Sequence, residues 1–171
     1  MRARLLPWLL RCVLVTGCGG SDQAPAETTV FLDDASDEAF AVFQDEVEQG
    51  HTVVNDAKAA VLVAPSNGQH LSAATPVPIS WAAAAGKPAL PHGIDTGTFV
   101  WIALSGGGGL AAGVNVVGLS STTWTPDADS WDKMVSAGTV DVAVYTATMD
   151  TGALTEGPFA PTAHYSFSIS Q

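Results

Sequence analysis

Positive charge is scarce in this chain of 171 residues, which has 6 Lys and Arg against 17 Asp and Glu. The three arginines, Arg2, Arg4 and Arg11, all precede Cys18, and every acidic residue follows it. Nucleic acids are bound by clustered cations that neutralise phosphates, and anionic membranes attract basic clusters in the same way. The composition therefore argues against a nucleic-acid partner and against a polybasic membrane-binding patch.

Cysteine is also scarce, since Cys12 and Cys18 are the only two. If the chain is cleaved before Cys18, residues 18–171 keep one cysteine, 3 lysines and 17 acids, which gives a net charge of −14. No intramolecular disulfide can then form, so stability has to come from a packed core. With 47% hydrophobic residues and five tryptophans, the chain has the composition to build one.

Signatures of catalysis and metal binding are missing as well. Residues 118–122 (Gly-Leu-Ser-Ser-Thr) lack the closing glycine of a nucleophile elbow, and residues 86–88 (Gly-Lys-Pro) lack the pattern of a phosphate loop. Asp127, Asp129 and Asp132 lack the spacing of a calcium loop, and we interpret them as acids at a helix start. The histidines are isolated from one another: His51, His70, His92 and His164. We predict a protein that is not an enzyme and has no cofactor, no catalytic residue and no metal site.

The first eighteen residues have the layout of an export signal. Arg2 and Arg4 form a charged start, an apolar stretch runs from Leu5 to Val15, and small residues follow. The apolar stretch is too short to span a bilayer. Its last residues, Val15-Thr16-Gly17-Cys18, resemble the bacterial lipobox. This resemblance implies cleavage before Cys18 and acylation of its thiol, and each acyl CH₂ buried in a bilayer contributes about 0.8 kcal/mol.

The same resemblance implies a location. It implies that residues 1–17 are a lipoprotein signal peptide and that Cys18 is the lipid-attachment residue. The membrane is then a partner of the protein through acylated Cys18. No Asp follows Cys18 directly, which favours the outer membrane of a Gram-negative bacterium. Because Pro7 and Arg11 interrupt the apolar stretch, two alternatives stay open: a misplaced start at Met1, and an apolar tail on a cytoplasmic protein.

Three further segments can be distinguished by composition and periodicity. Residues 18–35 are acidic and rich in small residues, which predicts a flexible linker. Residues 36–50 carry apolar side chains at Phe40, Phe43 and Val47, the spacing of a short amphipathic helix. Between Cys18 and Asp56 there are ten acids and no Lys or Arg, and we interpret this run as a solvated face.

From residue 60 the pattern is mainly β. Short apolar or alternating runs predict about seven strands, and Thr125-Pro126-Asp127 predicts the start of a helix inserted between late strands. The run of four glycines at 106–109 indicates a flexible hairpin. The fold class predicted for residues 60–171 is therefore an antiparallel β-sandwich. The predicted strands lie at residues 60–63, 77–81, 98–104, 110–119, 122–125, 140–145 and 165–169.

Two stretches resemble known families. A turn at residues 64–68 followed by Thr75 to Trp81 resembles the opening of bacterial immunoglobulin-like and fibronectin-III-like modules, in which a strand ends in a core tryptophan. The order of His92-Gly93, the segment from Trp124 to Trp131, and Glu156-Gly157-Pro158-Phe159 resembles uncharacterised lipoproteins of myxobacteria. The resemblance covers about residues 36–171 and implies one immunoglobulin-like domain behind a lipid anchor, with no implied activity.

These observations lead to one main hypothesis and several alternatives. The main hypothesis is a lipid-anchored cell-envelope protein that acts as a non-enzymatic binding module for a protein or glycan, or as a structural component. A carbohydrate-binding module would use Trp124 or Trp131 as a stacking platform, provided that either ring is exposed. A hydrolase would need a pocket that contains two acids. Packing of both tryptophans in the core is the simpler interpretation.

Overall fold

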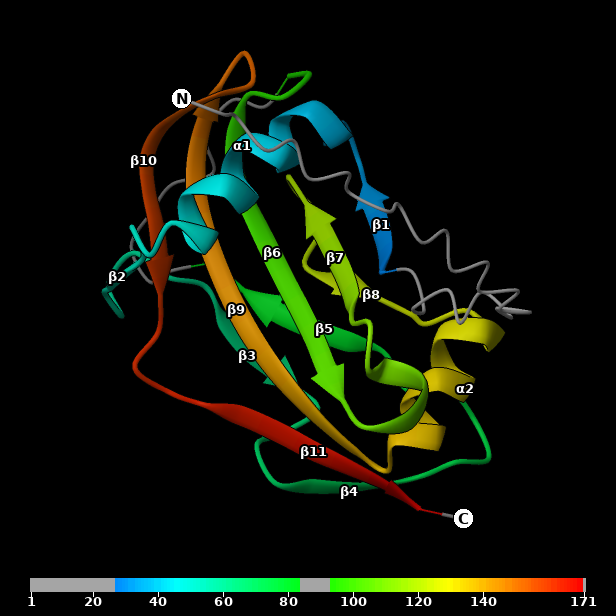
Figure 1. The fold of residues 1–171 in the computed structure, drawn as a ribbon. Helices are drawn as coiled ribbons and strands as arrows, with labels where there is room; N and C mark the ends of the chain where they lie inside the picture. Colours follow the sequence, from blue (N-terminus) through cyan, green and yellow to red (C-terminus); the bar gives the residue numbers. More distant parts are fainter. Residues whose placement is uncertain (1–26, 84–92, 171) are drawn as a thin grey trace, which may run out of the picture.

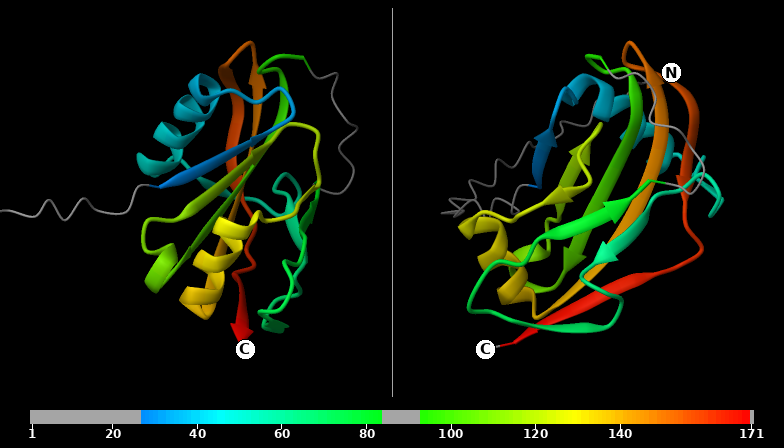
Figure 2. Two further views of the ribbon diagram at one scale, coloured as in Figure 1. Left: turned by 90° about the vertical axis from the view of Figure 1, so that its right-hand side faces the viewer. Right: turned by 180° about the vertical axis from the view of Figure 1, so that it is seen from behind.

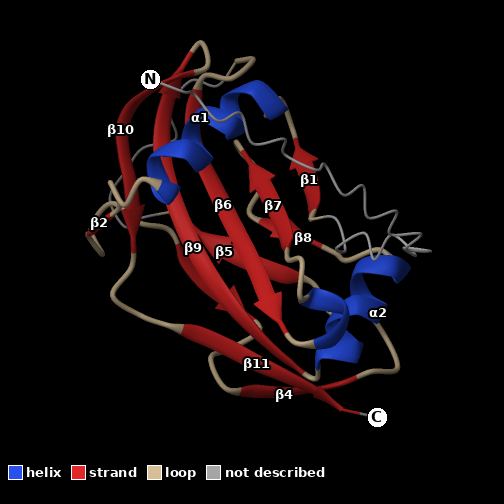
Figure 3. Cartoon of the chain, in the orientation of Figure 1, coloured by secondary structure: helices blue, strands red, loops and turns tan. Residues whose placement is uncertain are grey.

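The computed structural model describes residues 27–83 and 93–170. Within these ranges the chain forms eleven strands, two α-helices and one short 3₁₀ helix (Figures 1 and 3). In chain order they are β1 (Thr28–Leu32), α1 (Asp37–Glu48), β2 (Val53–Val54), β3 (Val61–Ala64), β4 (Gln69–Ser72), β5 (Ile79–Ala82), β6 (Gly97–Gly106), η1 (Gly108–Leu110), β7 (Val114–Gly118), β8 (Thr123–Trp124), α2 (Ala128–Ala137), β9 (Thr139–Asp150), β10 (Ala153–Ala160) and β11 (Tyr165–Ser170).

The strands form two open sheets, which we call the main sheet and the small sheet. The main sheet has eight strands, six of which follow the path β1-β7-β6-β9-β10-β2. The other two are β11, which pairs with the first residues of β9 (Thr139–Val142), and β4, which pairs with β11. The small sheet has the order β3-β5-β8. The long antiparallel pairing of β6 with β9, from Gly97↔Met149 to Gly106↔Val140, forms the centre of the main sheet.

The main sheet is covered on both faces. One face packs against the small sheet through a core that includes Ile79, Trp81, Ile102 and Val116, and α2 closes one end of this core. The other face packs against α1, which lies on the opposite side of the main sheet from the small sheet (Figure 2, left). Burial on both faces explains why β6 is apolar at nearly every position, as expected for a central strand.

The prediction of a β-sandwich is confirmed in its general form, but its antiparallel, seven-strand version is wrong. Three strand pairs are parallel: β1 with β7, β10 with β2, and β11 with β4. Parallel partners are far apart in the sequence, so no local turn signals the pairing. The four additional strands are β1, β2, β4 and β10. β2 and β4 are short, and β10 carries register shifts against β9 on either side of Glu156.

The predicted linker over residues 18–35 is wrong for its second half. Thr28–Leu32 forms β1, which pairs in register with Val114–Gly118 of β7. Small and acidic residues flank this segment in the sequence, yet its own five residues (Thr-Thr-Val-Phe-Leu) include β-branched and aromatic side chains that suit a strand. Residues 18–26 lie outside the described residues.

The helix predicted at 36–50 is confirmed as α1, and Phe40 and Phe43 are buried as its stripe predicts. Ser36 caps it by accepting a hydrogen bond from the backbone N–H of Ala39 at 3.2 Å. Its position relative to the domain differs from the prediction, because β1 precedes α1 and α1 packs on the main sheet. The folded domain therefore starts at β1 rather than at residue 60.

The second helix is also present, but it begins two residues later than predicted. The N-cap of α2 is Asp127, whose carboxylate accepts a hydrogen bond from the backbone N–H of Ser130 at 2.7 Å. Thr125 and Pro126 lie before the cap. Both Thr and Asp suit an N-cap, so the sequence alone left the two positions close in merit.

Candidate functional site

The predicted lipid-attachment residue, Cys18, lies outside the described residues, but the structure shows where the chain that follows it enters the fold. The backbone N–H of Thr28 donates to the carbonyl of Gly113 at 3.3 Å, and Lys133 Nζ donates to Thr28 Oγ1 at 2.8 Å. The start of β1 is therefore held between the loop before β7 and α2. This entry point is level with Leu104, near the end of β6 that leads into η1, because Thr28 pairs with Val114 and Val114 pairs with Leu104.

We call this end of the domain the glycine end, defined by residues 105–113 together with Thr28 and residues 136–139. The glycine run is not a loose hairpin, which corrects the sequence interpretation. A Cβ on Gly106 would lie 2.6 Å from the carbonyl oxygen of Thr139, and a Cβ on Gly109 would lie 2.9 Å from Lys133 Cα. The glycines let the chain approach the backbones of α2 and β9 more closely than any side chain would permit.

The opposite end of the main sheet carries acidic turns, and we call it the acidic end. Six acids lie there, and no lysine or arginine accompanies them among the described residues. They belong to the β1–α1 turn, the first turn of α1, the turn before β6 and the β9–β10 hairpin. These acids are Asp33, Asp34, Asp37, Glu38, Asp95 and Asp150.

Two of these carboxylates fasten turns together. Asp33 accepts hydrogen bonds from the backbone N–H groups of Ser120 and Ser121, at 3.1 and 2.7 Å, and from Ser121 Oγ at 2.9 Å. Asp95 accepts from Ser36 N at 2.9 Å and from Ser36 Oγ at 2.8 Å. Both residues adopt a positive φ, 59° and 50°, which Asp tolerates better than most residues.

The electrostatics of Asp33 reflect these contacts. Partial burial raises the pKa of Asp33, but the hydrogen bonds from Ser121 and Ser120 outweigh it, so the net pKa lies below the usual value for aspartate. The same cause acts elsewhere: backbone and side-chain hydrogen bonds from Thr162 lower the pKa of Asp56, and those from Ser130 lower the pKa of Asp127. These carboxylates are structural acceptors in their ionised form.

The four tryptophans in the described part of the chain lie in the core. Trp81 and Trp101 are buried as predicted, and Trp101 packs against Phe40, Phe43 and Tyr145. The two rings considered for carbohydrate stacking are buried as well, with Trp124 7% and Trp131 4% exposed. The indole N–H of Trp131 donates to the carbonyl of Ala73 at 3.0 Å. Neither ring is available to a sugar.

A hollow of about 150 Å³ lies where the outer edge of β9 changes partner. β11 pairs with β9 up to Val142 and β10 pairs with β9 from Thr146 onward, so residues 143–145 of β9 lie between the two partners. The lining residues are apolar or weakly polar and include no acid: Val142, Ala143, Val144, Tyr145, Ala160, Pro161, Ala163 and His164. Pockets for small-molecule ligands are usually about 300–1,000 Å³, so this hollow is small for such a role.

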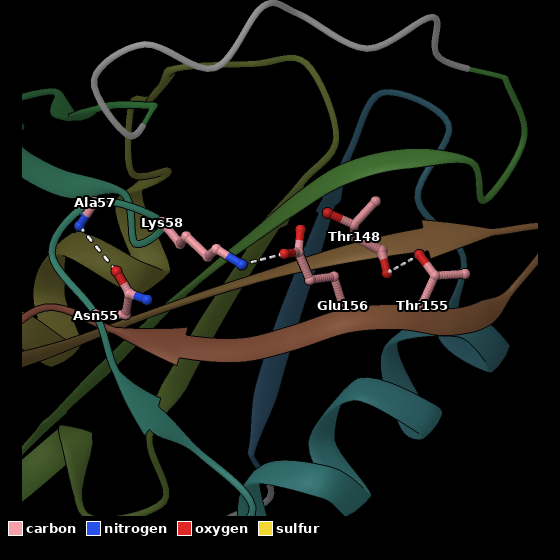
Figure 4. A network of polar contacts seen from close by, with 6 residues as sticks. All are labelled: Asn55, Ala57, Lys58, Thr148, Thr155 and Glu156. Atoms are coloured by element: carbon pink, nitrogen blue, oxygen red, sulfur yellow. Dashed lines mark hydrogen bonds and ion pairs between the residues drawn. The ribbon is translucent and has the colours of Figure 1, made fainter.

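Polar contacts fasten the chain around this hollow. Thr162, in the β10–β11 connection, donates to Asp56 through its backbone N–H at 2.7 Å and its hydroxyl at 2.8 Å. Nearby, Lys58 forms an ion pair with Glu156 of β10 (Figure 4), and its ammonium lies 5.0 Å from the centre of the Phe159 ring. These contacts hold the β2–β3 connection against β10. They have no local signal in the sequence because the partners are about a hundred residues apart.

The residues considered for metal binding remain separate. His51 Nδ1 lies 2.7 Å from Glu46 Oε2, His70 contacts Ser168, and His164 lines the hollow, whereas His92 lies outside the described residues. In residues 27–83 and 93–170, no three side chains of His, Cys, Asp or Glu come together in a way that could hold a metal ion.

Comparison of the chain with protein-family models, with curated proteins and with solved structures found no match. Neither helix in the described part of the chain combines the length and hydropathy needed to cross a membrane.

Proposed function

We propose that the protein is an exported lipoprotein, attached to a membrane through acylated Cys18, whose β-sandwich domain acts as a non-enzymatic binding or structural module of the cell envelope. The observation that carries the proposal is the sequence of residues 1–18, in which a charged start and an apolar stretch end in Val-Thr-Gly-Cys. The domain is held together without a disulfide, by two apolar cores on the faces of the main sheet. The outer membrane of a Gram-negative bacterium is the proposed location.

Within this proposal, the sandwich is of a broadly immunoglobulin-like kind. Support comes from Trp81, the core tryptophan of β5, which is 3% exposed and packs between the two sheets. The turn at residues 64–68 leads into β4, which lies between it and β5. The three parallel pairs set its strand order apart from an antiparallel module. A crystal structure tests this assignment, because a strand order unrelated to any immunoglobulin-like sandwich would contradict it.

The attachment is tested by incorporation of radiolabelled palmitate, followed by membrane fractionation. The wild-type protein should take up label and fractionate with membranes, whereas Cys18→Ala should do neither. Cys12→Ala is the matched control, because Cys12 belongs to the segment that cleavage would remove, and it should behave like the wild type. Label that persists in Cys18→Ala, or wild-type protein found in the soluble fraction, would contradict the proposal.

Carbohydrate binding and glycoside hydrolysis are not part of the proposed function. The rings that a carbohydrate-binding module would use, Trp124 and Trp131, are buried. The hollow beside β9 has no carboxylate in its lining, so it does not supply the pair of acids that glycoside hydrolysis needs.

A further inference from the structure

The two ends of the main sheet differ in their distance from the proposed lipid anchor. The described fold starts with Glu27 and β1, and Thr28 lies opposite Val114, which in turn lies opposite Leu104. Thr28 follows Cys18 by ten positions in the sequence. A chain spans at most about 3.3–3.6 Å per residue, so the anchored residue lies within ~35 Å of Thr28 at the glycine end.

The acidic end lies farther from this entry point. Along β6, Leu104, which is level with Thr28, is seven positions from Gly97 at the acidic end. At about 3.3 Å per residue, this is a distance of ~23 Å. The acidic end could meet the membrane only if residues 18–27 ran back along the sheet for most of their maximum length. Far fewer chain conformations achieve this than achieve the opposite orientation.

The two ends also differ in charge, and this difference favours the same orientation as the length of the tether. The acidic end carries six acids and no described cation, whereas the residues next to the glycine end include Glu27, Asp141 and Lys133, whose ammonium donates to Thr28. The exposed part of the loop at residues 105–111 is uncharged, and α2 with its N-cap adds Asp127, Asp129 and Asp132, so the charges around the glycine end are five negative and one positive. Bilayers that contain anionic lipid repel negative charge within about a Debye length, ~8–10 Å. Repulsion is therefore strongest for the acidic end.

We propose that the glycine end, residues 105–113 with Thr28 and residues 136–139, faces the lipid surface, and that the acidic end points away from it. The proposal rests on the proposed function, because it needs the anchor at Cys18. It assigns the acidic turns, which include Asp33, Asp95 and Asp150, to the side that meets other envelope components. The partner at the glycine end is the surface of an anionic bilayer.

The proposal is tested by placing one fluorophore at either end of the lipidated full chain. Ala111→Cys labels the glycine end and Ile94→Cys labels the acidic end, and both positions are exposed, Ile94 to 77%. Acylated Cys18 has no free thiol, so the introduced cysteine takes the dye. The protein is reconstituted into vesicles of phosphatidylethanolamine and phosphatidylglycerol that carry a headgroup nitroxide quencher.

We expect several-fold stronger quenching at position 111 than at position 94. Equal quenching at the two positions, or stronger quenching at position 94, overturns the orientation while leaving the anchor intact. Mass spectrometry of the same preparation reads the acylation of Cys18. If that residue carries no lipid, the proposed function fails and the orientation fails with it.

A charge-reversal variant distinguishes the effect of electrostatic repulsion on the orientation from the effect of the tether. The double variant Asp34→Lys with Glu38→Lys, at the acidic end, should bring the ratio of quenching at position 111 to quenching at position 94 closer to one. Added salt should reverse that change. Asp129→Lys on α2 is the matched control and should leave the ratio at or above the wild-type value. If the double reversal leaves the ratio unchanged at low salt, repulsion has no part in the orientation and the charge argument is wrong.

Discussion

The two ends of the main sheet close their turns by opposite means. At the acidic end, the carboxylates of Asp33 and Asp95 accept hydrogen bonds from neighbouring loops. At the glycine end, the chain packs against α2 and β9 because Gly106 and Gly109 have no side chains there. The first solution places carboxylates in the turns themselves, whereas the glycine run at residues 106–109 carries no charge. The turns at the two ends of the sheet therefore differ in charge although both are firmly held.

The largest effect is expected where α1 is held to the sheet near the acidic end. Phe43 is completely buried and packs edge-on against Trp101 at a ring distance of 5.8 Å. Phe43→Ala should lower the free energy of unfolding by about 3–5 kcal/mol, measured by urea denaturation. Val42→Ala, on the exposed side of α1, is the control and should change it by less than about 0.5 kcal/mol. Similar values for the two variants would mean that α1 is not part of the domain.

At the glycine end, a single added methyl group should be costly. Gly109→Ala brings a Cβ within 2.9 Å of Lys133 Cα, so we expect a loss of about 1–3 kcal/mol in the free energy of unfolding. Gly107→Ala is the matched control, because a Cβ there meets nothing within 4 Å and its φ of −79° suits alanine. It should be neutral or stabilising. Equal losses would show that the glycines supply flexibility rather than close packing.

At the acidic end, loss of the acceptor oxygens of Asp33 should destabilise the fold more than loss of its charge. Asp33→Ala removes three accepted hydrogen bonds and places alanine at a φ of 59°, so we expect a loss of roughly 1–2 kcal/mol by urea denaturation. Asp33→Asn keeps an acceptor oxygen and tolerates the same φ, so its loss should be smaller. An Asn variant as unstable as the Ala variant would contradict this account of the turn.

The smallest expected effect is a dependence of stability on pH. The pKa of Asp33 is lowered in the folded state, so its ionised form stabilises the fold above the unfolded pKa of about 3.9. This contribution is lost as the pH falls below that value and through the folded pKa. Asp33→Asn should therefore show a shallower loss of stability between neutral and acidic pH than the wild type. Gly107→Ala should keep the wild-type slope, and equal slopes for Asp33→Asn and the wild type would contradict the assignment.

The sequence allowed much of the core to be predicted because the relevant signals are local. Alternating valines and the apolar run at 98–104 predicted β9 and β6, and the spacing of Phe40 and Phe43 predicted α1. The buried positions of Trp81 and Trp101 followed from their places on strands. Each of these predictions depends on a periodicity within about ten residues.

The remaining features depend on contacts between distant segments. β1 is a strand because β7 lies beside it, more than eighty residues later in the sequence. The role of Gly106 becomes apparent only when β9 and α2 are in place, and the clamp between Asp33 and Ser121 joins positions 88 residues apart. For the same reason, the acidic and glycine ends could not be distinguished before the strands were aligned.

The anchor itself is tested most directly by the intact mass of the protein extracted from membranes. We expect a chain that begins at Cys18 and carries diacylglycerol on its thiol and an acyl chain on its new N-terminus. Both modifications should map to the N-terminal peptide after proteolysis. A mass equal to that of the unmodified chain from Met1, with Cys12 and Cys18 both free to react with a thiol reagent, would contradict the account.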